Sequence, residues 1–277
     1  MTTAELPSFD LVVASVDRVE QLGRLLASLG RQTHRDFRVL LIDQNDDDRL
    51  EEVVGGNPTL RIEHLRSARG LSRSRNVALA ALEAQLVAFP DDDCAYPDDL
   101  LERVARRFAD EPGLDGLTGR AVDVHGRSSP SWATDRVLLT RENLWNRAVS
   151  FAIFLRSDLV RQVGDFDEQL GLGSGTSWSS GEETEYLVRA VGRGAQIEYD
   201  PELVVVHDEK PVSDSLVARE GASVGYILRK HHYPARAVAR MLIRPAGGAL
   251  LALLRRDGTR ARLHLGTLRG RVLGYRS

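Results

Sequence analysis

Three consecutive acidic side chains, Asp91, Asp92 and Asp93, directly follow a short apolar segment and Pro90. Like charges this close together repel unless a cation or hydrogen-bond donors compensate them, and a bound divalent cation is the economical explanation. Carboxylate oxygens suit Mg²⁺ or Mn²⁺, which bind through one or two carboxylates while substrate phosphates complete the coordination shell. On these residues alone, a solvated acidic turn ahead of a helix near Pro97 is an equally good interpretation.

A second acidic group, Glu182, Glu183 and Glu185, follows a Gly- and Ser-rich segment at residues 171–181. One of these carboxylates could accept the proton of an attacking hydroxyl group. The alternative is a helix cap, because Ser180 and Glu183 have capping-box spacing and the helix dipole favours acids in a first turn. The residues by themselves favour the cap.

Three further polar features lie at or near the ends of predicted elements. His207 follows a β-branched run and offers a metal a nitrogen ligand, although a lone strand-end histidine is more often a surface residue. A predicted helix opened by Gly70 carries Arg73 and Arg75, which could hold a diphosphate, although two arginines on a helix more often form a solvated face. Asp43 ends a strand and could accept a hydrogen bond from a nucleobase or ribose; the alternative is a turn made with Asn45.

The elements that must position these residues alternate along the first 90 residues between short apolar runs and helical patterns. This order predicts an α/β fold with a doubly wound, mostly parallel central sheet. In such sheets ligands bind beyond the carboxyl ends of the strands, where Asp43 and Asp91 are expected. We expect strands at residues 9–16, 37–43, 60–65, 86–89, 116–124, 149–155 and 197–206, and helices at residues 18–29, 71–84, 97–109 and 182–191.

The charge of the chain is unevenly distributed. Residues 214–277 hold 13 Lys and Arg against 3 Asp and Glu, whereas the preceding residues hold 24 against 37. The two parts therefore face different partners. We expect one catalytic domain at residues 1–212 and a C-terminal helical tail at residues 213–277, whose segments are divided by Pro234 and Pro245.

Apolar residues recur at helical spacing among the arginines of this tail, as in Val238, Met241 and Leu242. Basic amphipathic helices can lie in an anionic lipid interface, where each arginine contributes about 1 kcal/mol. An acceptor carried on a lipid diphosphate would suit such a surface. The alternative, of equal weight, is that the helices pack on the catalytic domain and leave their arginines in water.

A single cysteine, Cys94, excludes an internal disulfide and a Cys-rich zinc site, so nothing argues for an oxidising compartment. The first residues lack a basic segment followed by an apolar run, and no stretch of about 18 apolar residues occurs. We therefore expect neither a signal peptide nor a spanning helix. The expected location is the cytoplasm, at the inner face of the membrane if the tail binds lipid.

The order of these motifs resembles that of the family 2 inverting glycosyltransferases of the A-type nucleotide-sugar fold, over residues 9–208. That family has a polar turn after its first strand, an acidic motif after its second, a Gly before an Arg-Asn pair, an Asp-x-Asp motif, and a closing Gly-rich loop, acidic pair and histidine. The matching segments here are Ala14–Arg18, Ile42–Asn45, Gly70–Asn76, Phe89–Asp93, Gly171–Gly175, Gly181–Glu185 and His207.

The resemblance implies a nucleotide diphosphate sugar as donor and Mn²⁺ or Mg²⁺ as cofactor. Asp91 and Asp93 match the Asp-x-Asp positions, and the Asp92 between them is the member expected to tolerate change. The implied donor-binding set is Ser15, Asp43, Arg75, Asp91 and Asp92, and the implied metal set is Asp91, Asp93 and His207.

For the acceptor, the resemblance implies that Glu183 is the catalytic base and that Glu182 helps to orient the attacking hydroxyl. The family usually has Asp where Glu183 stands, so either glutamate is a candidate base. Trp178, shortly before this pair, is a candidate for stacking on an acceptor sugar, against the alternative of a packing anchor. The implied reaction is a single displacement that inverts the anomeric carbon.

We therefore expect a metal-dependent, hexosyltransferase-like glycosyltransferase of bacterial cell-wall or other surface polysaccharide synthesis, or of glycolipid synthesis. One alternative is a sugar nucleotidyltransferase, which residues 9–18 disfavour because they contain no Gly-rich phosphate loop. Another is a catalytically silent scaffold of a polysaccharide assembly, which the intact acidic motifs disfavour. No nucleic-acid-binding motif accompanies the basic tail.

Overall fold

The computed structural model describes residues 5–129, 131–207 and 213–277. These residues form two compact units. The first unit contains residues 5–69, 73–166 and 186–207, and the second contains residues 70–72, 167–185 and 213–277. The domain boundary predicted after residue 212 adjoins residues 208–212, which lie outside the described part of the chain. The second unit thus combines the helical tail with the Gly- and Ser-rich segment that precedes it.

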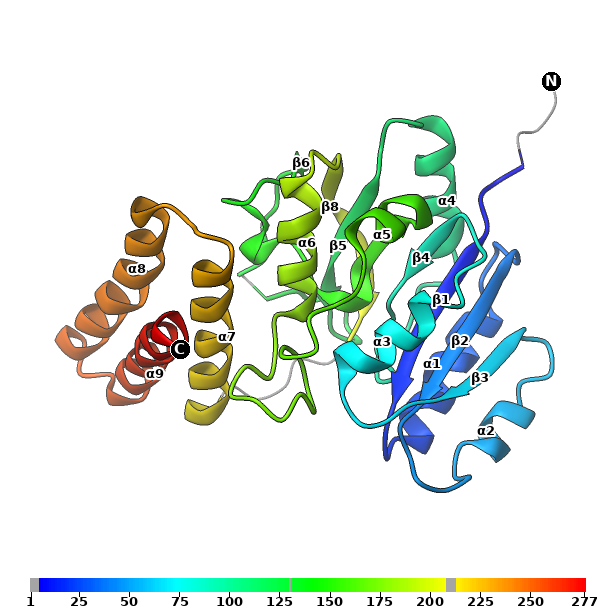
Figure 1. Cartoon of the computed structure of the whole chain (residues 1–277), viewed down its shortest axis with the longest axis horizontal. Helices are drawn as coiled ribbons and strands as arrows, with labels where there is room; N and C mark the ends of the chain where they lie inside the picture. Colours follow the sequence, from blue (N-terminus) through cyan, green and yellow to red (C-terminus); the bar gives the residue numbers. More distant parts are fainter. Residues whose placement is uncertain (1–4, 130, 208–212) are drawn as a thin grey trace. The chain divides into compact units, whose positions relative to one another are not determined.

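The first unit is built on an eight-stranded mixed sheet (Figure 1). Across the sheet its strands are β3 (Ile62–Arg66), β2 (Phe37–Asp43), β1 (Phe9–Ser15), β4 (Leu86–Ala88), β7 (Ile153–Arg156), β5 (Gly116–Val122), β8 (Ile197–Val206) and β6 (Val137–Leu138). The β1–β2, β2–β3, β1–β4 and β5–β8 pairs are parallel, and the other three neighbouring pairs are antiparallel. The predicted α/β class with a mostly parallel sheet is confirmed.

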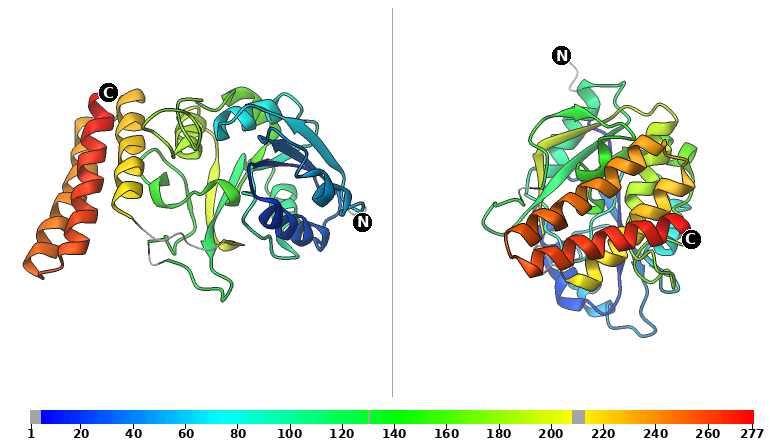
Figure 2. Two further views of the ribbon diagram at one scale, coloured as in Figure 1. Left: turned by 90° about the horizontal axis from the view of Figure 1, so that it is seen from below. Right: turned by 90° about the vertical axis from the view of Figure 1, so that its left-hand side faces the viewer.

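Helices cover both faces of this sheet (Figure 2). One face carries α1 (Val19–Gly30) and α4 (Leu100–Asp110), and the other carries α3 (Leu71–Leu79), α5 (Ser157–Val163) and α6 (Glu182–Gly192). Shorter elements are α2 (Glu51–Gly55) and the 3-10 helices η1 (Leu144–Asn146) and η2 (Ser150–Ala152). The first turns of α3 and α6 are assigned to the second unit.

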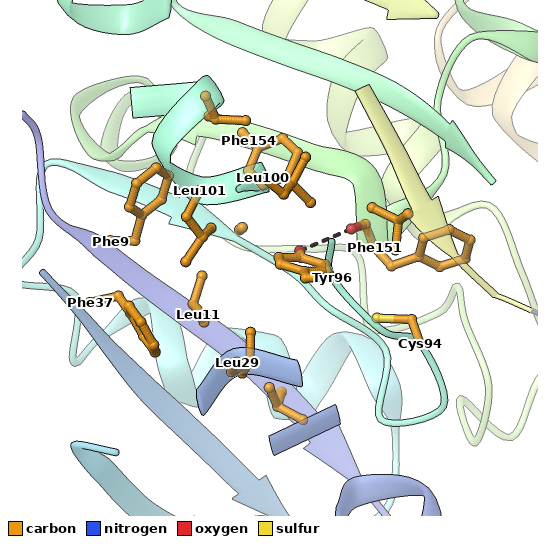
Figure 3. Close-up of a cluster of buried hydrophobic side chains, with 14 of the residues drawn as sticks. Phe9, Leu11, Leu29, Phe37, Cys94, Tyr96, Leu100, Leu101, Phe151 and Phe154 are labelled. Carbon is orange, nitrogen blue, oxygen red and sulfur yellow. Dashed lines mark hydrogen bonds between the residues drawn. The ribbon is translucent and has the colours of Figure 1, made fainter. Parts of the chain in front are cut away.

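Strand alternation builds the main core on the α1 and α4 face. Phe9 and Leu11 of β1 point to this side and are fully buried with Leu29 of α1, as period-2 alternation requires. Figure 3 shows these side chains beside Tyr96, whose hydroxyl donates to the carbonyl of Phe151 at 2.9 Å. This buried hydrogen bond ties the loop that follows the aspartate triplet to the 3-10 helix η2.

The expected element boundaries differ from the structure most at two places. The helix expected at residues 71–84 ends at Leu79, because the chain then turns so that the backbone N–H groups of Glu83 and Ala84 donate to the Asp10 carboxylate at 2.7 and 2.9 Å. The strand expected from residue 149 begins instead with η2. The sequence patterns also missed α5 and β6, which are both short.

In the second unit, α7 (Asp214–Lys230), α8 (Ala235–Leu254) and α9 (Gly258–Arg276) pack together (Figure 1). The helices α7 and α9 run in the same direction at very short range. A Cβ atom at Gly270 or Gly274 would collide with the backbone of Ala218 or Ala222. Glycine is needed at these positions because only its missing side chain lets the two backbones approach so closely.

Pro245 does not divide two helical segments, as the sequence predicted, but lies inside α8. A proline inside a helix leaves the carbonyl four residues earlier without its usual N–H donor. Here that carbonyl belongs to Met241, and it accepts a hydrogen bond from the guanidinium of Arg271 on α9. The Met241 carbonyl, which lacks an N–H donor because of the proline, thus receives its hydrogen bond from α9, and α8 continues past Pro245.

Much of α8 is apolar and exposed. Ile243, Leu250 and Leu254 are 68, 61 and 74% exposed. By length and composition α8 could cross a membrane, and only 22% of its most apolar window is buried. This finding corrects the expectation that no segment is apolar enough for a spanning helix; two glycines and three alanines interrupt the leucines in the second half of α8.

Candidate active site

The carboxyl ends of parallel strands bring the predicted donor residues to one edge of the sheet. Ser15 ends β1 directly opposite Asp43, which ends β2, and Asp91 follows β4. A two-way backbone bridge joins Ala95 to Val206 at 2.8 and 3.0 Å. Because Val206 ends β8, this bridge places the next residue, His207, beside the aspartate triplet.

The three residues predicted as metal ligands lie together. One ligand atom from each of Asp91, Asp93 and His207 falls within 4.8 Å of the others. The Nε2 atom of His207 lies 3.0 Å from Oδ1 of Asp93, and the imidazole stacks on Phe151 with ring centroids 4.6 Å apart. Ser150 donates to Asp91 at 3.2 Å. Two carboxylates and an imidazole form a donor set that fits a divalent cation such as Mn²⁺.

Asp92 has a different environment from its two neighbours, because it is 5% exposed and turned into the protein. It accepts hydrogen bonds from the Ser15 hydroxyl at 2.7 Å and from Arg18 at 2.8 Å. Burial raises the pKa of the Asp92 carboxyl, although Ser15 and Arg18 oppose this shift. The expectation that Asp92 tolerates change conflicts with this environment, since a substitution would leave buried partners unsatisfied.

Arg18 is a site residue that the sequence did not single out. Its guanidinium also pairs with Oδ2 of Asp93 at 2.6 Å and is 32% exposed. Burial alone would lower the pKa of Arg18, but the charges of Asp92 and Asp93 raise it. The available signal was its position in the polar turn after β1, at the sheet edge that also carries the triplet.

The buried guanidinium of Arg75 lies beside the carboxylate of Asp91. The guanidinium is 3.6 Å from Oδ1 of Asp91 and packs near the rings of Phe89 and Phe166, at 5.7 and 5.4 Å. The residue is 2% exposed. In this position Arg75 can orient the Asp91 carboxylate and add positive charge beneath a bound diphosphate.

Asp43 is fully buried and makes the local turn that was its alternative interpretation. Its Oδ1 atom accepts from the backbone and side-chain N–H groups of Asn45 at 2.8 and 2.7 Å. Its Oδ2 atom lies 3.0 Å from Nε2 of His64 and 3.4 Å from Arg66. The sequence did not identify His64 or Arg66, which belong to the neighbouring strand β3 and therefore lie beside Asp43 only in the sheet.

The predicted acceptor residues Glu182, Glu183 and Trp178 belong to the second unit. Glu182 is 4% exposed and lies against Gly171, where a Cβ atom would be 3.2 Å from its Oε2. Glu183 is partly buried in the first turn of α6. Trp178 stacks on Tyr226 of α7 with ring centroids 4.0 Å apart, which is the contact of a packing anchor.

Comparison with known proteins identifies the family. Residues 10–159 match the model of glycosyl transferase family 2. Because this is more than half of the chain, the protein belongs to that family.

Two curated relatives are glycosyltransferases. The chain is 27% identical over 259 residues to the pre-mycofactocin glycosyltransferase of Mycobacterium tuberculosis, covering 87% of this chain and 51% of the relative. It is 22% identical over 233 residues to glycosyltransferase AglE of Haloferax volcanii, covering 77% and 71%. The chain therefore spans about half the length of the mycobacterial relative.

Solved structures share the fold. The mannosyltransferase PcManGT of Pyrobaculum calidifontis, solved with GDP-Man and Mn²⁺, matches with a TM-score of 0.68 at 15% identity, covering 98% of this chain and 88% of that one. S. aureus TarS 1–349, solved with UDP-GlcNAc, matches with a TM-score of 0.64 at 18% identity, covering 95% and 92%. The central sheet is thus that of an A-type glycosyltransferase.

Proposed function

We propose that the protein transfers a sugar from a nucleoside diphosphate donor to a hydroxyl acceptor, with inversion at the anomeric carbon and with the help of a divalent cation. The observation that carries this proposal is the convergence of Asp91, Asp93 and His207 within 4.8 Å at the carboxyl edge of the sheet. A donor diphosphate would complete the coordination shell of a cation held there.

The residues around this site would hold the donor and its leaving group. A bound Mn²⁺ or Mg²⁺ would supply Lewis-acid stabilisation of the departing diphosphate. Ser150 and Arg75 orient Asp91, and His207 lies beside Asp93 as the third proposed ligand of the cation. Arg18 is exposed enough to pair with a donor phosphate as well as with the triplet, as a planar guanidinium does well.

The nucleobase end of the donor would lie near Ser15 and Asp43. Ser15 already donates to Asp92, and the Asp43 carboxylate is held by Asn45 and His64. Both side chains would therefore act from fixed positions, which lowers the entropic cost of binding. PcManGT and TarS were solved with GDP-Man and UDP-GlcNAc, so these two compounds are the first donors to test.

For the acceptor, we assign Glu183 the role of base and Glu182 the role of orienting the hydroxyl. Glu183 stands in the first turn of α6, and a carboxylate within hydrogen-bond reach of the attacking hydroxyl can accept its proton. The attacking oxygen would lose its proton to Glu183 as it bonds to the anomeric carbon, and the bond to the diphosphate oxygen would break. One face of Trp178 stacks on Tyr226, and the other face is the candidate stacking surface for an acceptor sugar.

The test is nucleoside diphosphate release and product formation from UDP-GlcNAc or GDP-mannose with MnCl₂. The wild type should turn over one of these donors, and Asp93→Asn should not do so at any Mn²⁺ concentration. A matched control is Asp98→Asn, which removes a carboxylate that is 59% exposed and pairs with Arg31. Equal turnover by the Asp93 variant and the wild type would refute the metal site.

The tail provides the membrane part of the proposal. Arg236, Arg240 and Arg244 recur at one-turn spacing in the first half of α8, and all three are exposed. Charges within a bilayer centre are costly, whereas an anionic interface attracts them. We therefore propose that α8 lies in the interface, at the cytoplasmic face of a membrane that carries a lipid-linked acceptor, and does not span the bilayer.

Vesicle flotation tests this surface. Binding should be stronger to vesicles with phosphatidylglycerol than to pure phosphatidylcholine, and replacing the three α8 arginines by Gln should weaken it. A charge-matched control replaces Arg31, Arg61 and Arg106, which are 57, 74 and 63% exposed on the first unit. Failure of the full chain to bind anionic vesicles at low salt would exclude the interface, and resistance to extraction at high salt and high pH would favour a spanning helix.

A further inference from the structure

A charged cluster around the buried Glu185 in the second unit joins the first turn of α6 to the end of α7. Glu185 is fully buried, and its Oε1 atom lies 2.8 Å from Nζ of Lys230 and 2.9 Å from Nε2 of His231. The same Lys230 ammonium lies 2.7 Å from Oδ2 of Asp167, which also accepts from the hydroxyl of Tyr226 at 2.9 Å. Lys230 of the helical tail thus pairs with two carboxylates, those of Asp167 and Glu185.

The pairing has a measurable electrostatic signature. Burial alone would raise the pKa of the Asp167 carboxyl, but the hydrogen bonds from Lys230, the backbone N–H of Gln169 and Tyr226 lower it. Burial and the neighbouring Asp167 raise the pKa of the Tyr226 hydroxyl. The carboxylate is therefore stabilised in its ionised form by groups of α7.

Close packing accompanies these charges. Gly181, immediately before α6, adopts a φ of +80°, and a Cβ atom there would lie 3.1 Å from Ile227 of α7. The hydroxyl of Ser180 donates to that of Ser223 at 3.2 Å. The entry to α6 is therefore fixed against α7 by packing, by a hydrogen bond and by the Glu185 ion pairs.

Glu185 lies in the same helical turn as Glu183, the base of the proposed reaction. Two helical residues separated by two positions point about 200° apart. The ion pairs that hold the Glu185 side chain against the end of α7 therefore also fix the direction in which the Glu183 side chain points. A carboxylate that must meet an attacking hydroxyl loses rate steeply when it is displaced, by up to about 100-fold for a 1 Å shift.

We propose that Glu185 is a positioning residue for Glu183, held by Lys230 and His231, so that the helical tail is a working part of the acceptor side of the enzyme. This inference rests on the proposed function, because it assumes that Glu183 is the base. It assigns the tail a role that membrane binding alone would not require.

The test compares Lys230→Met with Lys230→Arg and with the control Arg229→Met, which removes an exposed charge from the same helical turn. The kcat for UDP or GDP release from UDP-GlcNAc or GDP-mannose should fall about tenfold or more in Lys230→Met. Affinity for the nucleoside diphosphate with Mn²⁺ should stay unchanged. Lys230→Arg should restore most of the rate, and Arg229→Met should match the wild type.

Amide hydrogen exchange of the intact protein provides a readout that does not depend on turnover. Exchange at residues 182–186 should accelerate in Lys230→Met and in Glu185→Gln, but not in Arg229→Met. Unchanged exchange together with wild-type kcat would overturn the inference, and so would a parallel loss of kcat and nucleotide affinity. If the wild type transfers no sugar, the proposed function fails, and the exchange result still decides whether the tail holds this turn.

Discussion

The two edges of the central sheet both carry carboxylates, but the two groups are compensated in different ways. At the amino edge, Asp10 is 1% exposed and accepts from Arg38 at 2.8 and 3.1 Å and from the backbone of Glu83 and Ala84. At the carboxyl edge, one ligand atom from each of Asp91, Asp93 and His207 lies within 4.8 Å of the others, and all three residues are partly exposed. The carboxylate of Asp10, with its guanidinium and backbone donors, therefore stabilises the fold. The converging carboxylates and imidazole at the carboxyl edge favour a bound cation instead.

Removing the functional carboxylate should have the largest effect on activity. We expect Asp93→Asn to lower the rate of sugar transfer by about 1,000-fold or more, since metal stabilisation of the leaving group is worth several kcal/mol and each 1.36 kcal/mol is tenfold. Urea unfolding should change by about 1 kcal/mol or less, because the side chain keeps its size. Transfer assays and urea titrations of the same preparation measure both quantities.

Breaking the structural ion pair should have the opposite pattern. Arg38→Met leaves Asp10 buried without its cation, and we expect a loss of about 3–5 kcal/mol in the free energy of unfolding. Activity per folded molecule should stay near that of the wild type. A variant that unfolds normally but loses transfer would mean that the amino edge, too, is part of the active site.

Mn²⁺ should stabilise the folded protein through the residues of the carboxyl edge and not through those of the amino edge. A cation that binds the folded state raises its stability by about 2.7 kcal/mol at 100 times the dissociation constant. We therefore expect Mn²⁺ to raise the melting temperature of the wild type and of Arg38→Met by similar amounts. The same titration of Asp93→Asn should give little or no increase, and an undiminished increase would place the cation elsewhere.

Asp92 should behave as an intermediate case, because it is a member of the triplet with the environment of a structural carboxylate. We expect Asp92→Asn to cost about 1–3 kcal/mol of stability through its buried partners, and Ser15→Ala to cost about 1 kcal/mol. Mn²⁺ should still stabilise the folded fraction of both variants. Thermal melts with and without Mn²⁺ distinguish this outcome from the loss of binding expected for Asp93→Asn.

The parts of the molecule that sequence patterns predicted depend on local order. Short apolar and β-branched runs located β1, β2 and β8, the last of them ending at His207. The rule that ligands bind beyond the carboxyl ends of parallel strands located the triplet. These inferences need no knowledge of distant partners, because each motif directly follows its strand in the sequence.

The remaining features depend on partners that are far apart in the sequence. Arg18 and Asp92 are separated by 74 positions, and no local pattern links them, so the structural role of Asp92 was missed. Asp10 ends α3 early through residues 83 and 84, and Arg271 keeps α8 continuous at Pro245. In the last two examples a side chain that is distant in the sequence forms a hydrogen bond with a backbone group. That hydrogen bond determines the local structure against the preference of the local sequence.

The central claim is that Asp91, Asp93 and His207 bind the cation that holds the donor diphosphate. Anomalous diffraction at the manganese edge, from crystals grown with MnCl₂ and either UDP or GDP, tests it most directly. The account predicts one strong peak within coordination distance of all three side chains, with a nucleotide phosphate on its open side. A peak at other residues, or an ordered nucleotide with no peak beside the triplet, would contradict it.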